Sequence, residues 1–139
     1  MILYKATTAF KNKDKTIKLP SFRYHLDIYN VSLVMIFGED HMREHMDLSD
    51  HDSANIDAYC LDFLRLNSEV IFFFKDKPKI ASIVHECLHA SNMILDYIGH
   101  KFDSGNDEAH AYPIEHLYNV VLKGWEKHNK KQISHDYLT

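Results

Sequence analysis

Long hydrophobic runs, an export signal and a strong excess of one charge are all missing from this sequence of 139 residues. No run of about 18 apolar residues exists, so no membrane-spanning helix is expected. The N-terminus lacks the basic start, apolar core and small-residue cleavage site of a signal peptide, which favours a cytoplasmic location. The net charge of -4 argues against a general nucleic-acid-binding protein, because such proteins usually carry a basic face.

Cysteine is also scarce, and the two present, Cys60 and Cys87, lie in apolar surroundings. In a chain without an export signal we expect both thiols to be reduced and buried rather than joined in a disulfide. Cys87 falls on the apolar side of a predicted helix, so we interpret it as a small core residue. The sequence shows no internal repeat, low-complexity tract or linker, which predicts one domain over residues 1–139.

The apolar and charged fractions, 45% and 26%, are those of an ordinary globular protein. We expect an α+β fold in which a small antiparallel sheet of three or four strands packs on two long antiparallel helices. Residues 1–20 and 127–139 are expected to be flexible. The predicted strands are 22–28, 31–37, 58–66 and 70–74, with a short one at 2–7 and a turn at 67–68, and the predicted helices are 79–98 and 105–128.

Residues 85–89 read His-Glu-Cys-Leu-His, which is the H-E-x-x-H pattern. On a helix, residues four apart share a face, so His85 and His89 are placed to bind one metal ion together. Glu86 lies beside them, where a carboxylate can act as a general base on a water activated by the metal. Two histidines and a carboxylate ligand suit zinc, so the cofactor expected is one Zn2+ per chain.

A competing pattern occurs at residues 41–45, which spell the inverted motif H-x-x-E-H. Context favours the later motif, because Pro78 and Gly99 are good boundaries for a helix that carries it. Residues 38–53 are mostly polar and read as a solvated helix or loop. We therefore interpret His41 and His45 as a chance match.

A catalytic zinc usually has three protein ligands and one open position. The metzincin pattern would place a third histidine six residues after His89, where this chain has Leu95, so that pattern is excluded. The alternative plan takes a glutamate from a following helix. Glu108, within Asn-Asp-Glu-Ala-His-Ala-Tyr at 106–112, is the natural candidate.

Residues 83–90, 94–99 and 106–112 together resemble small bacteriophage-encoded zinc metallopeptidases of the gluzincin type. The resemblance covers roughly residues 28–125. It extends more distantly to phage-repressor-cleaving metallopeptidases and to the thermolysin plan of two histidines and a downstream glutamate. It implies a minimal zincin-like scaffold, a peptide or protein substrate and, for a phage protein, the cytoplasm of a bacterial host. The sequence departs from the family at Pro113, which should kink the second helix and shift Tyr112.

The mechanism expected from this arrangement is peptide hydrolysis by a zinc-activated water, with Glu86 as general base. Tyr112 and His110 are candidate donors to the oxyanion of the intermediate. The alternative for Tyr112 is a buried aromatic residue, and the alternative for His110 is a surface histidine or one that supports a zinc ligand without contacting the metal. Asp96 is a candidate to orient His89, and Asp107 is the alternative for that role.

Two other functions stay open: a non-catalytic zinc-binding phage accessory or host-takeover protein, and a metal-free binding module. The strand that contains Phe72, Phe73 and Phe74 precedes the motif helix. As an edge strand it would be able to pair with an extended peptide substrate, although three aromatic residues in a row more often fill the core. No feature of the sequence indicates an oligomeric state or a membrane partner.

Overall fold

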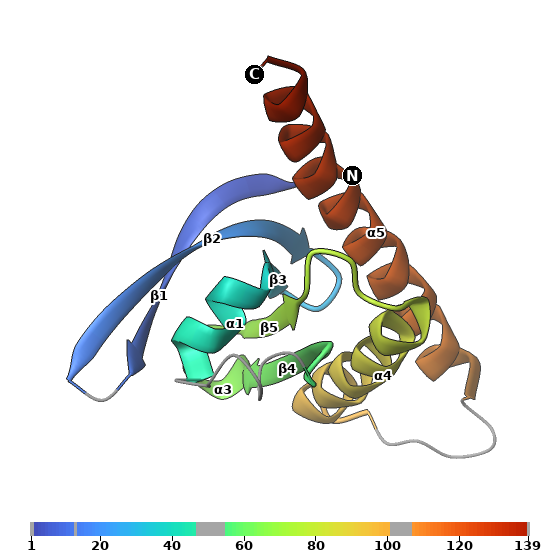
Figure 1. Cartoon of the computed structure of the whole chain (residues 1–139). Coiled ribbons are helices and arrows are strands. Elements are labelled where there is room, and N and C mark those ends of the chain that lie inside the picture. The colour runs from blue at the N-terminus through green and yellow to red at the C-terminus, as the bar shows by residue number, and fades with distance from the viewer. Residues whose placement is uncertain (1, 13, 47–54, 101–106, 139) are drawn as a thin grey trace.

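A computed structural model describes residues 2–12, 14–46, 55–100 and 107–138, without the side chains of residues 12, 107–110 and 131–138 (Figure 1). The fold is α+β, with a five-stranded mixed sheet in the order β1-β2-β3-β5-β4. The strands are β1 (Tyr4–Asn12), β2 (Lys15–Leu26), β3 (Val31–Phe37), β4 (Ala58–Phe63) and β5 (Glu69–Phe74). The helices in the described ranges are α1 (Glu39–Met46), α3 (Leu64–Asn67), α4 (Ile80–Tyr97) and α5 (Asp107–Leu138).

The sheet differs from the expected small antiparallel one in strand number and in one pairing. β1, β2 and β3 form successive antiparallel pairs, but β3 and β5 are parallel, and β4 pairs antiparallel with β5 at the far edge. The parallel pair arises because α1 and β4 lie between β3 and β5 in the sequence and return the chain to the same end of the sheet. The mixed topology makes β4, rather than β5, an edge strand.

The two faces of the sheet have separate cores. Alternate residues such as Leu33 and Phe72 pack under α4 and α5, whereas their neighbours Val34 and Phe73 pack with Met42 of α1 on the opposite face. All six residues of β5 are buried, because helices or other strands cover both of its faces. The run of three phenylalanines therefore lies inside the sheet and fills the core, which was the alternative to an edge strand that pairs with a peptide.

The N-terminal and C-terminal segments both contain regular secondary structure, and their expected flexibility stays a prediction. Residues 1–20 contribute β1 and half of β2, and Phe10, Ile17 and Leu19 are buried in the second core. Lysines between these apolar residues gave the segment the appearance of a polar tail. The second tail, residues 127–139, continues α5 as far as Leu138.

Smaller differences occur where strands end. Ile28 is 83% exposed and lies in the turn after β2, outside the strand predicted for it. β4 stops at Phe63, and the short helix α3 replaces the rest of the predicted strand. Ser68 has a φ of 56°, and this left-handed conformation at the end of α3 reverses the chain into β5. The connection is thus a helical turn rather than a two-residue hairpin.

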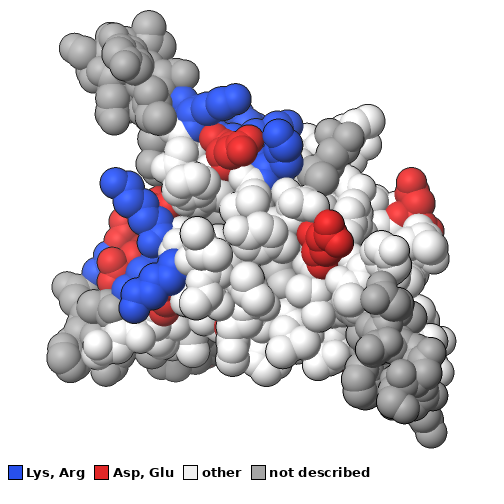
Figure 2. Space-filling model, turned by 90° about the vertical axis from the view of Figure 1, so that its right-hand side faces the viewer, with Lys and Arg blue, Asp and Glu red and all other residues white. Residues whose placement is uncertain are grey.

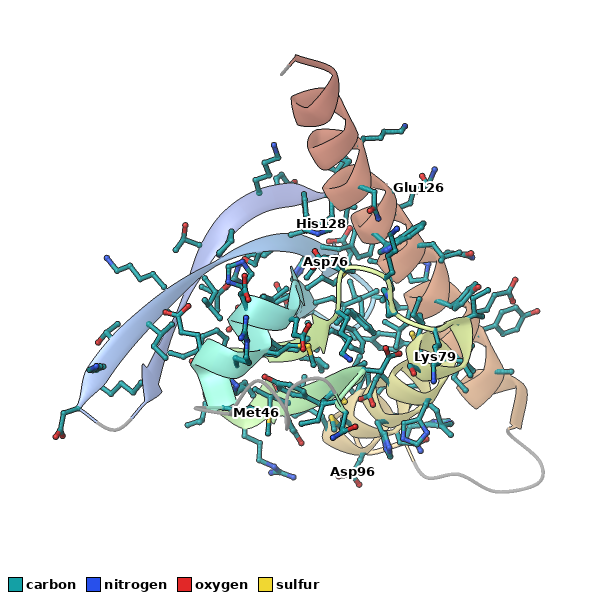
Figure 3. The ribbon with its side chains drawn as sticks, viewed as in Figure 1. Met46, Asp76, Lys79, Asp96, Glu126 and His128 are labelled. Carbon is teal, nitrogen blue, oxygen red and sulfur yellow. The ribbon has the colours of Figure 1, made fainter. Side chains whose placement is uncertain are left out.

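Helix α5 is attached to the sheet at a close approach. A Cβ atom at Gly124 would lie 2.9 Å from Sδ of Met35, so only glycine leaves room for this contact. The indole N–H of the next residue, Trp125, donates to the backbone oxygen of Asp76 at 2.8 Å. One turn after Gly124, Nε2 of His128 lies 2.8 Å from the Asp76 carboxylate (Figure 3). These contacts fasten α5 to the loop that leads into α4. Within the described ranges, no helix combines the length and apolar character needed to cross a membrane.

Candidate active site

The motif helix α4 forms where the sequence predicts it. The chain enters from Pro78, and the backbone N–H of Lys79 donates to the Asp57 carboxylate at 2.9 Å. The helix ends at Tyr97, and Gly99 lies just beyond it with a φ of 82°, which allows the N–H of His100 to donate back to the carbonyl of Leu95 at 2.8 Å. Both ends of α4 are therefore fixed. The helical periodicity then decides which side of α4 each residue of the motif faces.

His85 and His89 lie together on the exposed side of α4. Their Nε2 atoms are 3.0 Å apart, and the ring centroids are 4.6 Å apart with an interplanar angle of 82°. Two imidazoles that share a tetrahedral zinc have nitrogens roughly 3.3 Å apart, given zinc–nitrogen distances of about 2.0–2.1 Å. The pair fits two ligands of one zinc ion, and without metal the same geometry allows a hydrogen bond between the rings when one nitrogen carries a proton.

Glu86 is positioned differently from the two histidines. It is only 7% exposed and lies on the side of α4 that faces the edge strand β4. The Sγ atom of Cys60, on β4, is 4.0 Å from the backbone oxygen of Glu86. The glutamate thus occupies the seam between α4 and β4, next to an exposed histidine pair.

The two cysteines are free and protonated at neutral pH. Burial raises the pKa of the Cys60 thiol, and the Glu86 carboxylate raises it further. Burial and the charge of Glu86 raise the pKa of Cys87 to about 12. Neither thiol is a ready nucleophile, because nucleophilic attack requires the thiolate. Cys87 is fully buried, which confirms its interpretation as a core residue, whereas the place of Cys60 beside Glu86 had no signal in the sequence.

The expected third ligand lies at the start of α5. Glu108 is the second residue of that helix, and α5 packs against α4. The side chains of Asp107, Glu108 and His110 lie outside the described residues. Among the residues that are described, no group of three His, Cys, Asp or Glu side chains able to hold a metal is found. Glu108 as a ligand and His110 as an oxyanion donor therefore stay predictions.

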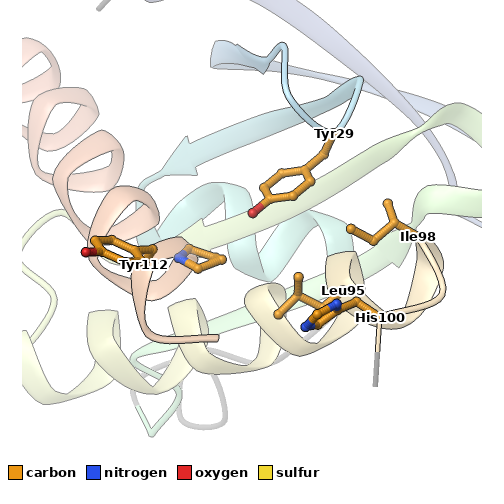
Figure 4. Close-up of a pocket in the computed structure, with 6 residues that line it drawn as sticks. Tyr29, Leu95, Ile98, His100 and Tyr112 are labelled. Carbon is orange, nitrogen blue, oxygen red and sulfur yellow. The ribbon is translucent and has the colours of Figure 1, made fainter. Parts of the chain in front are cut away.

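Tyr112 faces solvent, with 68% of its surface exposed, so it is not the buried aromatic residue that the sequence left as an alternative. It lines one side of an open cavity of about 320 Å³ between the β2–β3 turn and the two long helices (Figure 4). α5 is continuous through Pro113. The cavity is lined by Tyr29, Leu95, Ile98, His100, Tyr112 and Pro113. Because neither histidine of the motif is among them, the cavity and the histidine pair are separate features of the surface.

Asp96 is exposed in the last turn of α4, where Figure 3 shows it pointing away from the body of the protein. It lies seven residues after His89, which is about 10 Å along the helix axis. No hydrogen bond found among the described residues joins the two side chains. Its role in orienting His89 stays a prediction.

The inverted motif on α1 is packed more closely than its polar sequence suggested. His45 stacks on Phe73 with centroids 4.6 Å apart, and its Nδ1 lies 3.0 Å from the hydroxyl of Tyr59. Burial lowers the pKa of His45, which favours the neutral ring. His41 is half-buried, and its Nδ1 has no hydrogen-bond partner in the described part of the chain. The segment is a helix with one exposed side, as one of the two expectations had it, but it packs through His41 and His45 as well as Met42. Residues 47–54 lie outside the described ranges.

The exposed face of α4, which carries the histidine pair, has few charged residues. Between Lys79 and Asp96, the only charged residue of α4 is the nearly buried Glu86. Figure 2 shows the side of the molecule that carries α5, with most of its charged side chains near the margins and a broad uncharged area between them. Large apolar residues, Ile80, Val84 and Leu88, are exposed on α4 at intervals of four. Among the described residues, the exposed face of α4 itself is therefore largely apolar.

Comparisons with known proteins identify no relative of this chain. No protein-family model matches the chain, and neither a curated protein nor a solved structure shows significant similarity to it. The candidate site accordingly rests on the geometry of α4 and β4 and on the residues of the motif.

Proposed function

We propose that this protein is a zinc-dependent metallopeptidase. The observation that carries the proposal is the convergence of the Nε2 atoms of His85 and His89, 3.0 Å apart on an exposed helix face, with Glu86 one position away. In a chance match, nothing would require the two Nε2 atoms to lie at a distance close to the nitrogen–nitrogen distance of two histidines that bind one zinc ion.

The residues divide the work of peptide hydrolysis between them. His85 and His89, with Glu108 from α5, would hold the zinc. A bound zinc supplies a Lewis acid that activates water and polarises the scissile carbonyl. Glu86 accepts the proton of the attacking water and passes it to the leaving amine. Tyr112 is proposed as an oxyanion donor, since it carries an exposed hydroxyl in the first turns of α5.

The edge strand β4 is the proposed docking site for the substrate. Its inner edge pairs with β5, and it is the last strand of the sheet in the order that the described residues form. An extended peptide can add to such an edge through backbone hydrogen bonds. Because Glu86 lies in the seam between α4 and β4, a peptide bound there would pass close to the general base.

A second function, zinc binding without catalysis in a phage accessory protein, is favoured by one observation. Glu86 is only 7% exposed, and a general base needs access to a water molecule. If the seam between α4 and β4 stays closed, the histidines would hold zinc for stability alone. The two functions therefore differ in whether Glu86 is needed.

The first test is the metal content of the purified native chain, measured by elemental mass spectrometry. We expect about one zinc per chain in the wild type, because a site of three protein ligands binds one ion. The His85→Ala and Glu108→Ala variants should lose it, and Glu115→Ala, which removes an exposed carboxylate further along α5, should keep it. Absence of zinc from the wild type after zinc is added back would overturn the proposal.

A further inference from the structure

The feature that the proposed mechanism leaves unexplained is how the nearly buried Glu86 is held. A carboxylate taken out of water needs hydrogen-bond donors to offset the cost of burial. Cys60 lies directly opposite on the edge strand, on the face of the sheet that α4 covers. Its register partner on β5 is the fully buried Phe72, so the backbone that carries the thiol is well fixed.

We propose that Cys60 is a positioning residue for Glu86, and that its S–H group donates a hydrogen bond to the Glu86 carboxylate. The Sγ atom is already within 4.0 Å of the backbone oxygen of the same residue. This contact places the thiol next to Glu86, and the proposed bond directs its hydrogen to the carboxylate. The contact stands without the proposed function, whereas its consequence for catalysis rests on that function.

The state of the thiol agrees with this role. Burial is the main cause that raises the pKa of Cys60, followed by the charge of Glu86 and by a hydrogen bond to the Glu86 side chain. At neutral pH the sulfur therefore keeps its proton and is a donor. Cys87, on the same helix as Glu86, feels burial and the same charge but has no such hydrogen bond among its causes. Cys87 is accordingly the matched control for Cys60.

A thiol suits a base that must stay reactive. An S–H group is a weak donor, so it orients the carboxylate without the strong attraction that a lysine or arginine would exert. Stronger donors would hold the anion too tightly for it to accept a proton from water. Cys60 would thus orient the Glu86 carboxylate without strongly stabilising its negative charge.

The contact is tested first by alkylation of the metal-free full-length chain with iodoacetamide, with each cysteine followed by peptide mass spectrometry. Because the thiolate is the reacting species, Glu86→Gln should speed the modification of Cys60 by roughly three- to tenfold. Glu115→Gln is the control and should leave the rate unchanged. Acceleration confined to Cys60 supports the proposal. No acceleration, or equal acceleration of Cys60 and Cys87, overturns it.

The catalytic consequence is tested with the zinc-loaded chain and fluorescein-labelled casein as a generic unfolded substrate. Cys60→Ala should lower kcat by roughly tenfold with little change in KM or zinc content, since the base is misplaced while binding is kept. Cys60→Ser restores a donor and should recover most of the activity, and Cys87→Ala should stay close to the wild type. Equal activity of Cys60→Ala and wild type would overturn the positioning role. If the wild type cleaves nothing, the proposed function fails, and the alkylation result alone still decides whether Cys60 holds Glu86.

Discussion

Glu86 is the residue at which the two uses of a zinc site on α4 would diverge. It lies beside the histidines in sequence but in the seam under β4 in space. A structural zinc would require only its ligands, His85, His89 and Glu108 in this proposal, whereas hydrolysis also requires a base with access to water. Experiments that separate zinc binding from proton transfer are therefore the most informative at this scale.

Replacement of Glu86 with glutamine should abolish hydrolysis and leave zinc binding intact. The amide has nearly the same shape but cannot accept the proton, and loss of a general base typically costs about 10²- to 10⁴-fold in rate. Zinc content and steady-state kinetics of the same preparation provide the measurement. A Glu86→Gln variant that keeps wild-type kcat would show that another group is the base.

His45 should make the fold less stable in weak acid. Burial lowers its pKa in the folded protein below the ordinary value of 6.5, so the unfolded chain binds a proton first as the pH falls. This contribution to stability is complete above pH 6.5 and is lost as the pH drops through the folded value. Urea unfolding at several pH values should show a flatter pH dependence in His45→Phe than in the wild type. An equal pH dependence of the unfolding free energy in the two proteins would show that His45 is not the source of the acid sensitivity.

At the scale of elements, two contacts determine how the helices sit on the sheet. α5 approaches β3 at Gly124, and the loop between β5 and α4 is fastened to α5 through Asp76. Because α5 also carries Glu108 in its first turn, the docking of this helix decides where the predicted third ligand lies relative to α4. Packing far from the motif thus bears on the site.

Gly124→Ala should destabilise the protein despite the better helix propensity of alanine. The propensity gain is about 1 kcal/mol, whereas a Cβ atom 2.9 Å from the buried Sδ of Met35 forces overpacking that costs about 1–3 kcal/mol. We expect a net loss of roughly 1 kcal/mol in the free energy of unfolding, measured with urea. Asn119→Ala, at an exposed position of the same helix, is the control and should be neutral or stabilising. A more stable Gly124→Ala would mean that the contact relaxes freely.

At the scale of the whole molecule, zinc should couple the site to overall stability. A ligand that binds only the folded state stabilises it by about 2.7 kcal/mol at a concentration a hundredfold above its Kd. Thermal unfolding of the wild type should therefore shift to higher temperature with zinc and back with a chelator. The His85→Ala/His89→Ala double variant should show no shift. A wild-type Tm that is indifferent to zinc would favour the metal-free binding module.

The sequence by itself determined the features that depend on local periodicity. The spacing of four between His85 and His89 places them on one face of a helix, and Pro78 and Gly99 mark its ends, so α4 and its histidine pair were predictable. The α+β class and strand β3 follow from equally local patterns. These properties need no knowledge of which segments meet in space.

Only the tertiary structure decided the features that depend on strand order and packing. Pairing of β3 with β5 moved the phenylalanine run into the middle of the sheet and made β4 the edge. That order places Cys60 beside Glu86, 26 residues apart in the sequence. Local patterns could not predict this contact, because strand order is set by the global burial of both sheet faces rather than by any single segment.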